Sequence, residues 1–279
     1  MSSSIGTVVK CSVFGESHGE AIGCVLDGLP AGEPIDMEEI YLQMGRRTPG
    51  FDRTSTPRKE SDTPHILSGM LDGRTTGAPL AVMIKNENVR SKDYGNIMSM
   101  PRPGHADYTA HVRYDGYNDV RGGGHFSGRL TAALVFAGAV CRQILRRRGI
   151  SIGGHVLEIH GVRDLELDPV NVDSKLLEDL ASRRFAVIDK AAEEKMRGEI
   201  EAARKGQDSV GGIIEAAAVG LPAGIGSPMF DGIENRLAAA LFGIPAIKGI
   251  EFGAGFGFAK MRGSEANDPF EFTKGGEVV

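Results

Sequence analysis

Apolar residues at helical spacing make residues 128–148 the clearest predicted element of the chain. They recur on one helical face: Leu130, Leu134, Ala137, Cys141, Ile144 and Leu145. Ser127 precedes this stretch as a candidate N-cap. Three arginines at 146–148, followed by Gly149, are typical of a helix C-terminus. The pattern predicts one long helix with an apolar face.

Capping patterns and apolar runs predict the other elements. Three helices are expected: one that starts at Asp36 and ends near 46–47, one over 188–205 that ends at Gly206, and one from Asp231 to about Phe242. Glu39 and Glu234 each stand three residues after an aspartate and complete a capping box. Apolar or alternating runs between glycines predict strands around 6–14 and 22–29.

One short motif occurs twice in matching surroundings. Leu-Pro-Ala-Gly at 29–32 follows a predicted strand and precedes the Asp36 helix. The same four residues at 221–224 follow the strand region 210–219 and precede the Asp231 helix. Two hypotheses stay open: two related halves within one domain, or chance, because so short a match is a weak signal.

Composition narrows the class of protein. The chain has 279 residues, of which 41% are hydrophobic and 25% are charged, as in ordinary globular proteins. A net charge of −5 argues against nucleic-acid binding, and no run reaches the ~20 apolar residues of a membrane span. The N-terminus has no secretion signal, and the three cysteines are widely spaced. We expect a cytoplasmic protein with free thiols that binds no membrane.

The last ten residues predict a strand, a turn and the start of a returning strand, over 270–279. A domain rarely stops inside a hairpin. We therefore expect the natural polypeptide to continue beyond Val279.

Histidines set among glycines are the strongest candidate chemistry. His18 lies in Gly-Glu-Ser-His-Gly, His105 follows Arg-Pro-Gly, and His125 follows three glycines. Histidine titrates near neutrality, and glycine lets backbone N–H groups approach an anion. Asp107 is placed to orient the His105 ring, and the loop of His125 leads into a helix N-terminus, where phosphate binds well. The pattern predicts a site that moves protons beside a phosphate.

Clustered arginines on an acidic chain favour a small anionic ligand over a polyanion. Arg47 and Arg53 lie in a basic stretch, 46–59, and Arg102 and Arg129 flank the histidine motifs. Arginine suits bidentate recognition of phosphate and carboxylate, although solvated surface arginines are the simpler explanation for most of 46–59. His105, His111 and His125 lack the spacing of a zinc helix, so no metal is expected. The hydrolase elbow and the P-loop are both absent.

Together these motifs resemble the chorismate synthase family. The similarity extends in order over nearly the whole chain, from about Gly6 to Gly263. The matching segments are 15–19, 23–30, 46–50, 75–77, 102–107, 124–131, 208–212, 220–224 and 246–251.

The resemblance implies an α+β fold, a β-α-β sandwich with helices packed between two mainly antiparallel sheets, and one domain over 1–279. It implies a carbon-oxygen lyase that eliminates phosphate from 5-enolpyruvylshikimate 3-phosphate to give chorismate with reduced FMN, and it implies a homotetramer. The implied roles are catalysis by His18 and His105, substrate binding by Arg47, Arg53, Arg102 and Arg129, and FMN contact by His125, Phe126, Ser127, Pro245 and Ala246.

One departure from the family is substantial. Family members continue with an Asn-x-x-Gly-Gly stretch, a Lys-Pro segment and an Arg-His-Asp motif, which carry further flavin contacts, and none is present here. The domain is therefore expected to lack its C-terminal segment. The alternative function is a catalytically inactive remnant that binds phosphorylated metabolites or pairs with a partner subunit.

Overall fold

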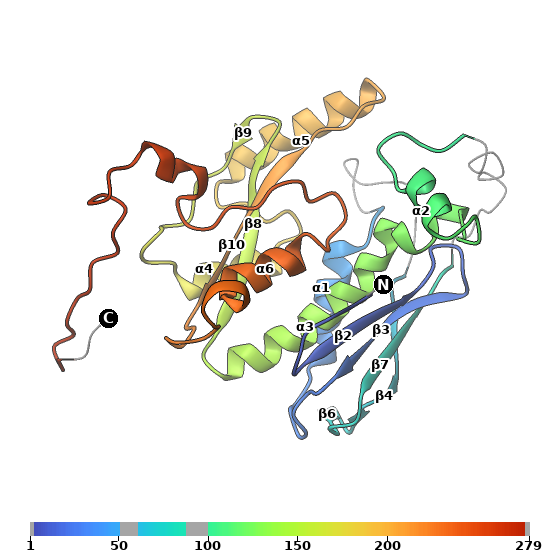
Figure 1. Cartoon of the computed structure of the whole chain (residues 1–279), viewed down its shortest axis with the longest axis horizontal. Coiled ribbons are helices and arrows are strands. Elements are labelled where there is room, and N and C mark those ends of the chain that lie inside the picture. Colours follow the sequence, from blue (N-terminus) through green and yellow to red (C-terminus); the bar gives the residue numbers. More distant parts are fainter. Residues whose placement is uncertain (1–2, 51–60, 88–99, 277–279) are drawn as a thin grey trace. The chain divides into compact units, whose positions relative to one another are not determined.

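The computed structural model describes residues 3–50, 61–87 and 100–276. The chain forms two compact units, Met1–Gly224 and Ile225–Val279. Both are drawn in Figure 1, and each is described by itself. The single domain expected over 1–279 stays a prediction.

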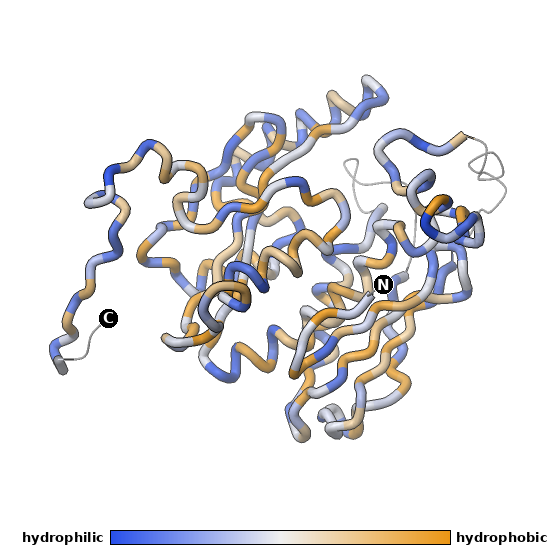
Figure 2. The backbone as a smooth tube through the Cα atoms, in the orientation of Figure 1, coloured by the Kyte–Doolittle hydropathy of each residue, from blue (hydrophilic) through white to orange (hydrophobic). Residues whose placement is uncertain are grey.

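The first unit contains a five-stranded antiparallel sheet in the order β1-β2-β3-β7-β4. Its strands are β1 (Ser4–Ile5), β2 (Lys10–Gly15), β3 (Ala21–Asp27), β4 (Pro64–Ser68) and β7 (Leu80–Lys85). The strands predicted around 6–14 and 22–29 are thus confirmed, with β2 starting later because Gly6 has a left-handed φ of 101°. Along β7, Leu80, Val82 and Ile84 are buried alternately with less buried neighbours, and Figure 2 shows the hydrophobic residues along these strands.

A second antiparallel sheet in the same unit has the order β10-β8-β9. It consists of β8 (Ser151–Ile159), β9 (Val162–Arg163) and β10 (Gly212–Val219), and a small hairpin pairs β5 (Met70–Leu71) with β6 (Arg74–Thr75). Helix α3 (Thr131–Arg147) contacts β3 of the larger sheet and β8 of this one. The predicted α+β fold, with helices between two antiparallel sheets, is therefore confirmed (Figure 1).

Helix α3 is the predicted long helix, and half of its predicted apolar face is buried. Leu130, Ala137 and Ile144 are buried, whereas Leu134, Cys141 and Leu145 are only half-buried. The fully enclosed Phe136 and Val140 lie outside the predicted face. By length and composition alone, 128–147 is the one helix in the described part of the chain that passes the test for a membrane span. Since 56% of that window is buried, it is a core helix.

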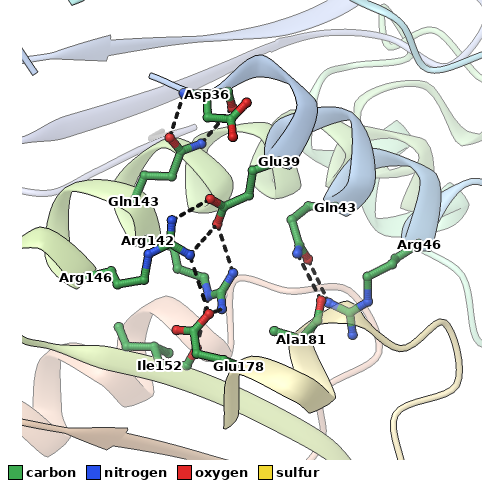
Figure 3. A network of polar contacts seen from close by, with 10 residues as sticks. All are labelled: Asp36, Glu39, Gln43, Arg46, Arg142, Gln143, Arg146, Ile152, Glu178 and Ala181. Carbon is green, nitrogen blue, oxygen red and sulfur yellow. Dashed lines mark hydrogen bonds and ion pairs between the residues drawn. The ribbon is translucent and has the colours of Figure 1, made fainter. Parts of the chain in front are cut away.

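Polar contacts join α3 to α1 (Met37–Arg47) and to α4 (Ser174–Ser182), as Figure 3 shows. Arg142 donates to Glu39 at 3.0 Å and also to Glu178 of α4. Arg146 donates to the second oxygen of Glu39 at 2.7 Å. Partly buried ion pairs of this kind fix the relative rotation of packed helices, because both partners need each other once they leave water.

The predicted helix ends are partly right. Asp36 caps α1 by accepting from Glu38 N–H at 2.9 Å, and α5 (Lys190–Lys205) ends at Gly206. The cap predicted at Asp231 is wrong. In the second unit, α6 (Ile233–Leu241) begins after Gly232 without a side-chain cap, because the carbonyl of Asp231 accepts from Ser227 N–H at 3.0 Å and closes a separate turn.

The described chain also has several short helical segments, among them 3₁₀ turns at Arg121–Phe126, Gly128–Leu130 and Met229–Asp231. Helix α2 (Asp107–Arg113) lies in the first unit, and a 3₁₀ segment covers Gly255–Lys260 in the second. The strand predicted at 270–273 is reduced to a single β-bridge residue, Phe272, among the described residues.

The repeated Leu-Pro-Ala-Gly segments have the same backbone geometry in the first unit. Gly28 after β3 and Gly220 after β10 have φ of 83° and 80°, and Gly32 and Gly224 both have φ of 83°. A Cβ on Gly28 would lie 2.2 Å from Val8 O, and one on Gly220 would lie 2.1 Å from Gly149 O. The two halves therefore repeat a close contact as well as a sequence, which favours the internal repeat over chance.

These glycines give a matched pair for a stability test. Gly28→Ala and Gly32→Ala both force alanine into a left-handed backbone, at a cost of about 1–2 kcal/mol. Only the first also drives a methyl group into a backbone carbonyl, since nothing lies within 4 Å of a Cβ on Gly32; this adds about 1–3 kcal/mol. In urea unfolding, the free energy of unfolding of Gly28→Ala should be well below that of Gly32→Ala. Equal unfolding free energies would contradict the close contact.

Candidate functional site

A loop of three glycines brings the two predicted catalytic histidines together. Gly122, Gly123 and Gly124 have φ of 59°, 84° and 54°, a region that other residues rarely enter. A Cβ on Gly122 would lie 2.1 Å from Nδ1 of His18, and a Cβ on Gly123 would lie 2.8 Å from Nε2 of His105. The histidine rings therefore lie against adjacent residues of one loop, although 87 positions of sequence separate them.

His18 is buried in a turn that other parts of the chain hold in place. Ser17 N–H donates to Gly124 O at 3.1 Å, which joins the turn to the glycine loop. Asn86, at the end of β7, donates through Nδ2 to the carbonyls of Glu16 and Gly19, both at 2.9 Å. Sequence reasoning missed Asn86, since no local pattern connects an asparagine at a strand end with this turn.

Asp107 orients His105, as predicted. Its Oδ1 lies 2.6 Å from Nδ1 of His105, and the His105 side chain is 28% exposed. Arg102 donates to the same carboxylate through Nε at 2.8 Å and Nη2 at 2.9 Å. These hydrogen bonds from Arg102 hold the pKa of Asp107 well below its ordinary value. A buried carboxylate that stays ionised in this way fixes the orientation of the ring.

Arg129 and Arg47 share a carboxylate that sequence analysis did not single out. Asp62 is almost fully buried; its Oδ1 accepts from Nη1 of Arg129, and its Oδ2 lies 2.5 Å from Nη1 of Arg47. Arg129 also donates to Asn86 Oδ1 at 3.0 Å and to Lys85 O at 3.2 Å. Two of the predicted substrate-binding arginines are therefore held side by side by one buried anion.

Of three neighbouring residues assigned to the flavin, two make hydrogen bonds within the protein and one is exposed. His125 donates from Nδ1 to Gly15 O at 2.7 Å, and its Nε2 lies 2.8 Å from the hydroxyl of Ser3. Ser127 accepts from Arg129 N–H at 3.2 Å and caps the turn before α3. Phe126 is 38% exposed. Of the three, Phe126 presents the most surface to a ligand.

The remaining predicted residues lie elsewhere. Arg53 falls outside the described residues. Pro245 and Ala246 belong to the second unit, where Ala246 has an unusual φ of 70°. No group of three or more metal-ligating side chains occurs in 3–50, 61–87 or 100–276.

The three cysteines are free thiols, as predicted. The hydrogen bond that the Cys24 thiol donates to Cys11 raises the pKa of Cys24 far above its usual value. Burial raises the pKa of Cys141. Because the thiolate is the reactive form, neither residue is a nucleophile.

A small hollow, too tight to admit a water molecule, lies beside His105. His105, Asp107, Val120, Gly123 and Phe126 are among its lining residues. Sites for drug-sized ligands usually measure about 300–1,000 Å³. The described residues therefore form no ligand-sized pocket at this point, although His105 and Phe126 line the same small hollow.

Comparison with known proteins gives one consistent result. A family model described as chorismate synthase matches residues 9–277. The chain is 48% identical over 274 residues to the chorismate synthase of Thermococcus kodakarensis, covering 98% of this chain and 74% of that protein. It is 47% identical over 270 residues to that of Thermococcus gammatolerans, covering 97% and 74%. A solved structure described as a crystal structure of chorismate synthase superposes with a TM-score of 0.76 at 30% identity, over 98% of this chain and 76% of that one.

The Asp107 carboxylate gives a stability test with a definite pH dependence. Because its pKa is depressed in the folded state, Asp107 stabilises the protein above the ordinary aspartate pKa, and the contribution is lost as pH falls through the folded-state value. Asp107→Asn should cost about 1–3 kcal/mol at neutral pH, the usual effect of losing hydrogen bonds to a charged group whose partners are partly exposed. The cost should shrink toward pH 3. Urea unfolding of both proteins at the two pH values measures this, and a difference that does not change with pH would contradict it.

Proposed function

This chain belongs to the chorismate synthase family, and we propose that it catalyses the reaction of that family on 5-enolpyruvylshikimate 3-phosphate. In that reaction the carbon-oxygen bond to phosphate and a ring carbon-hydrogen bond break, and a second ring double bond forms. The enzyme is a lyase, and the proposed subclass is a carbon-oxygen lyase acting on phosphates. The observation that carries the proposal is the meeting of His18 and His105 on the glycine loop.

We assign anion binding to the arginine cluster. The substrate carries both phosphate and carboxylate, and Arg47 and Arg129 together outweigh the single charge of Asp62. Preorganised cations stabilise the negative charge that develops as phosphate departs. Arg53 is proposed to add to this cluster. Arg102, which donates to Asp107 through two of its nitrogens, acts mainly by keeping His105 in place.

Proton handling is assigned to the two histidines. His18 sits in the turn beside the glycine loop and is proposed to assist the departing phosphate as an acid. His105 is turned by Asp107 so that its other ring edge lies against Gly123, and it holds a proton for the cofactor. Positioned acids and bases of this kind contribute about 10²- to 10⁴-fold to a rate.

Reduced FMN is the proposed cofactor, and when bound it supplies the electron chemistry of this redox-neutral elimination. Part of the described site is open to a flavin, because the His105 side chain is 28% exposed and the neighbouring Phe126 is 38% exposed. The other proposed flavin contacts are His125, Ser127, Pro245 and Ala246. His125 and Ser127 serve by shaping the loop, given their internal hydrogen bonds.

The alternative of an inactive remnant is not favoured, because the similarity runs over nearly the whole chain. A small-molecule substrate follows from the family. A homotetramer and a cytoplasmic location remain proposals.

Anaerobic turnover tests the proposal directly. The purified protein is given 5-enolpyruvylshikimate 3-phosphate with chemically reduced FMN, and released phosphate and chorismate are measured. We expect both products in equal amounts and no turnover with oxidised FMN. Binding of the substrate without product under reducing conditions would favour the inactive remnant.

The histidines give a second test. His105→Ala and His18→Ala should each lower kcat by about 10²- to 10⁴-fold, because each removes a positioned proton carrier. Circular dichroism and urea unfolding check that the fold persists. His65→Ala, at an exposed position of β4, is the control and should leave kcat unchanged. Near-normal kcat in a folded His105→Ala would remove that residue from the mechanism.

A further inference from the structure

Asp62 occupies an unusual position for a carboxylate. Its side chain is fully buried, and the Arg129 side chain beside it is 2% exposed. Its backbone has a left-handed φ of 50°, a conformation that persists only where the surroundings demand it. Isolated buried charges are strongly disfavoured, so Asp62 and Arg129 require each other.

The two oxygens of Asp62 go to different arginines. Oδ1 accepts from Arg129, which precedes α3, and Oδ2 accepts from Arg47, the last residue of α1. A single carboxylate therefore sets the separation of two guanidinium groups that come from different elements. The three side chains together carry a net charge of about +1, which leaves the cluster attractive to a further anion.

Asn86 extends the same network to the histidine turn. Its Oδ1 accepts from Nε of Arg129 at 3.0 Å, while its Nδ2 donates to the carbonyls of Glu16 and Gly19. One amide thus contacts the arginine cluster and the residues on either side of His18. A displacement of Arg129 would therefore move the His18 turn through Asn86, and a displacement of that turn would move Arg129.

We propose that Asp62 and Asn86 are positioning residues: Asp62 fixes Arg129 and Arg47 as one preassembled phosphate site, and Asn86 fixes the His18 turn against it. The proposal rests on the function assigned to this site above. The proposal explains why a buried carboxylate, Asp62, lies between two arginines that are proposed to bind an anion. A mere counter-charge would weaken anion binding, whereas a positioning group strengthens it by holding both donors ready.

The sign of the change in affinity separates these two roles. Asp62→Asn removes the negative charge at almost constant shape and turns an amide N–H₂ toward one guanidinium. If Asp62 positions the arginines, the dissociation constant for inorganic phosphate and for 5-enolpyruvylshikimate 3-phosphate should rise about 10- to 100-fold, as when one buried partner of a charged pair is lost. Asp62→Glu keeps the charge but displaces the carboxylate, and it should also weaken binding. Tighter or unchanged phosphate binding in a folded variant would overturn the role of Asp62.

Glu33→Gln is the matched control. Glu33 is likewise shared between two arginines, Arg147 and Arg148, at 2.8 Å and 3.2 Å. That pair lies at the end of α3 farthest from Arg129 in the sequence. Calorimetric titration with phosphate should give the wild-type dissociation constant for Glu33→Gln. An equal loss in this control would show a general charge effect and overturn the proposal.

Asn86→Asp tests the role proposed for Asn86, which is to fix the His18 turn against the arginine cluster. It keeps an oxygen for Arg129 but loses both N–H donations to the turn of His18. We expect kcat at saturating substrate to fall at least about 10-fold, as for a misplaced catalytic group, in addition to any rise in KM that the added carboxylate causes by lowering the net charge of the cluster. An unchanged kcat, or a loss confined to KM, would overturn the role of Asn86.

The outcomes distinguish this inference from the proposed function. If wild type binds inorganic phosphate but not 5-enolpyruvylshikimate 3-phosphate, the assigned reaction is wrong, and the phosphate titration of Asp62→Asn still decides the role of Asp62. If wild type turns over and Asp62→Asn binds phosphate normally, the function stands and the inference fails.

Discussion

The left-handed backbone at Gly122–Gly124 is the constraint on which the site depends. Three successive residues with positive φ leave no room for side chains, and that space is taken by the rings of His18 and His105. A Cβ at either of the first two glycines would overlap a histidine ring. Because these glycines carry no Cβ atoms, the loop leaves room for the two histidine rings. It lets two rings from distant segments approach the same short piece of backbone, and Gly124 O accepts from the His18 turn at the same place.

Around this loop, each cationic group that sequence analysis assigned to a substrate, and that the structure describes, is held by a buried carboxylate. Arg102 is paired with Asp107, and Arg129 and Arg47 are paired with Asp62. The desolvation cost of the buried Arg129 guanidinium explains why Asp62 lies beside it. In the proposed anion-binding site, such pairs also hold the cations in fixed positions before the substrate arrives. In such a site less reorganisation remains to be done on binding.

The fold contains the same local turn twice. After β3 and again after β10, a glycine with a left-handed φ passes within contact of a backbone carbonyl, and Leu-Pro-Ala-Gly follows. Helix α3 then packs between the sheets to which these strands belong. Its N-terminal end carries Arg129, and polar contacts with α1 and α4 limit its rotation. The position of Arg129 is thus set by the core as well as by its own ion pair.

The sequence by itself determined the long helix, the strands of the first hairpin, the histidine-glycine motifs and the family, because these depend on periodicity and on short ordered motifs. It also paired His105 with Asp107, since the two lie in one turn. Only the tertiary structure showed that Asp62 and Asn86 contact Arg129, which lies far from both in the sequence. It also showed two local contacts that residue spacing left open: Arg102 donates to Asp107, and Gly232 rather than Asp231 precedes α6. The contacts of Arg129 depend on which groups lose water together when distant segments meet, and spacing along the chain carries no record of that.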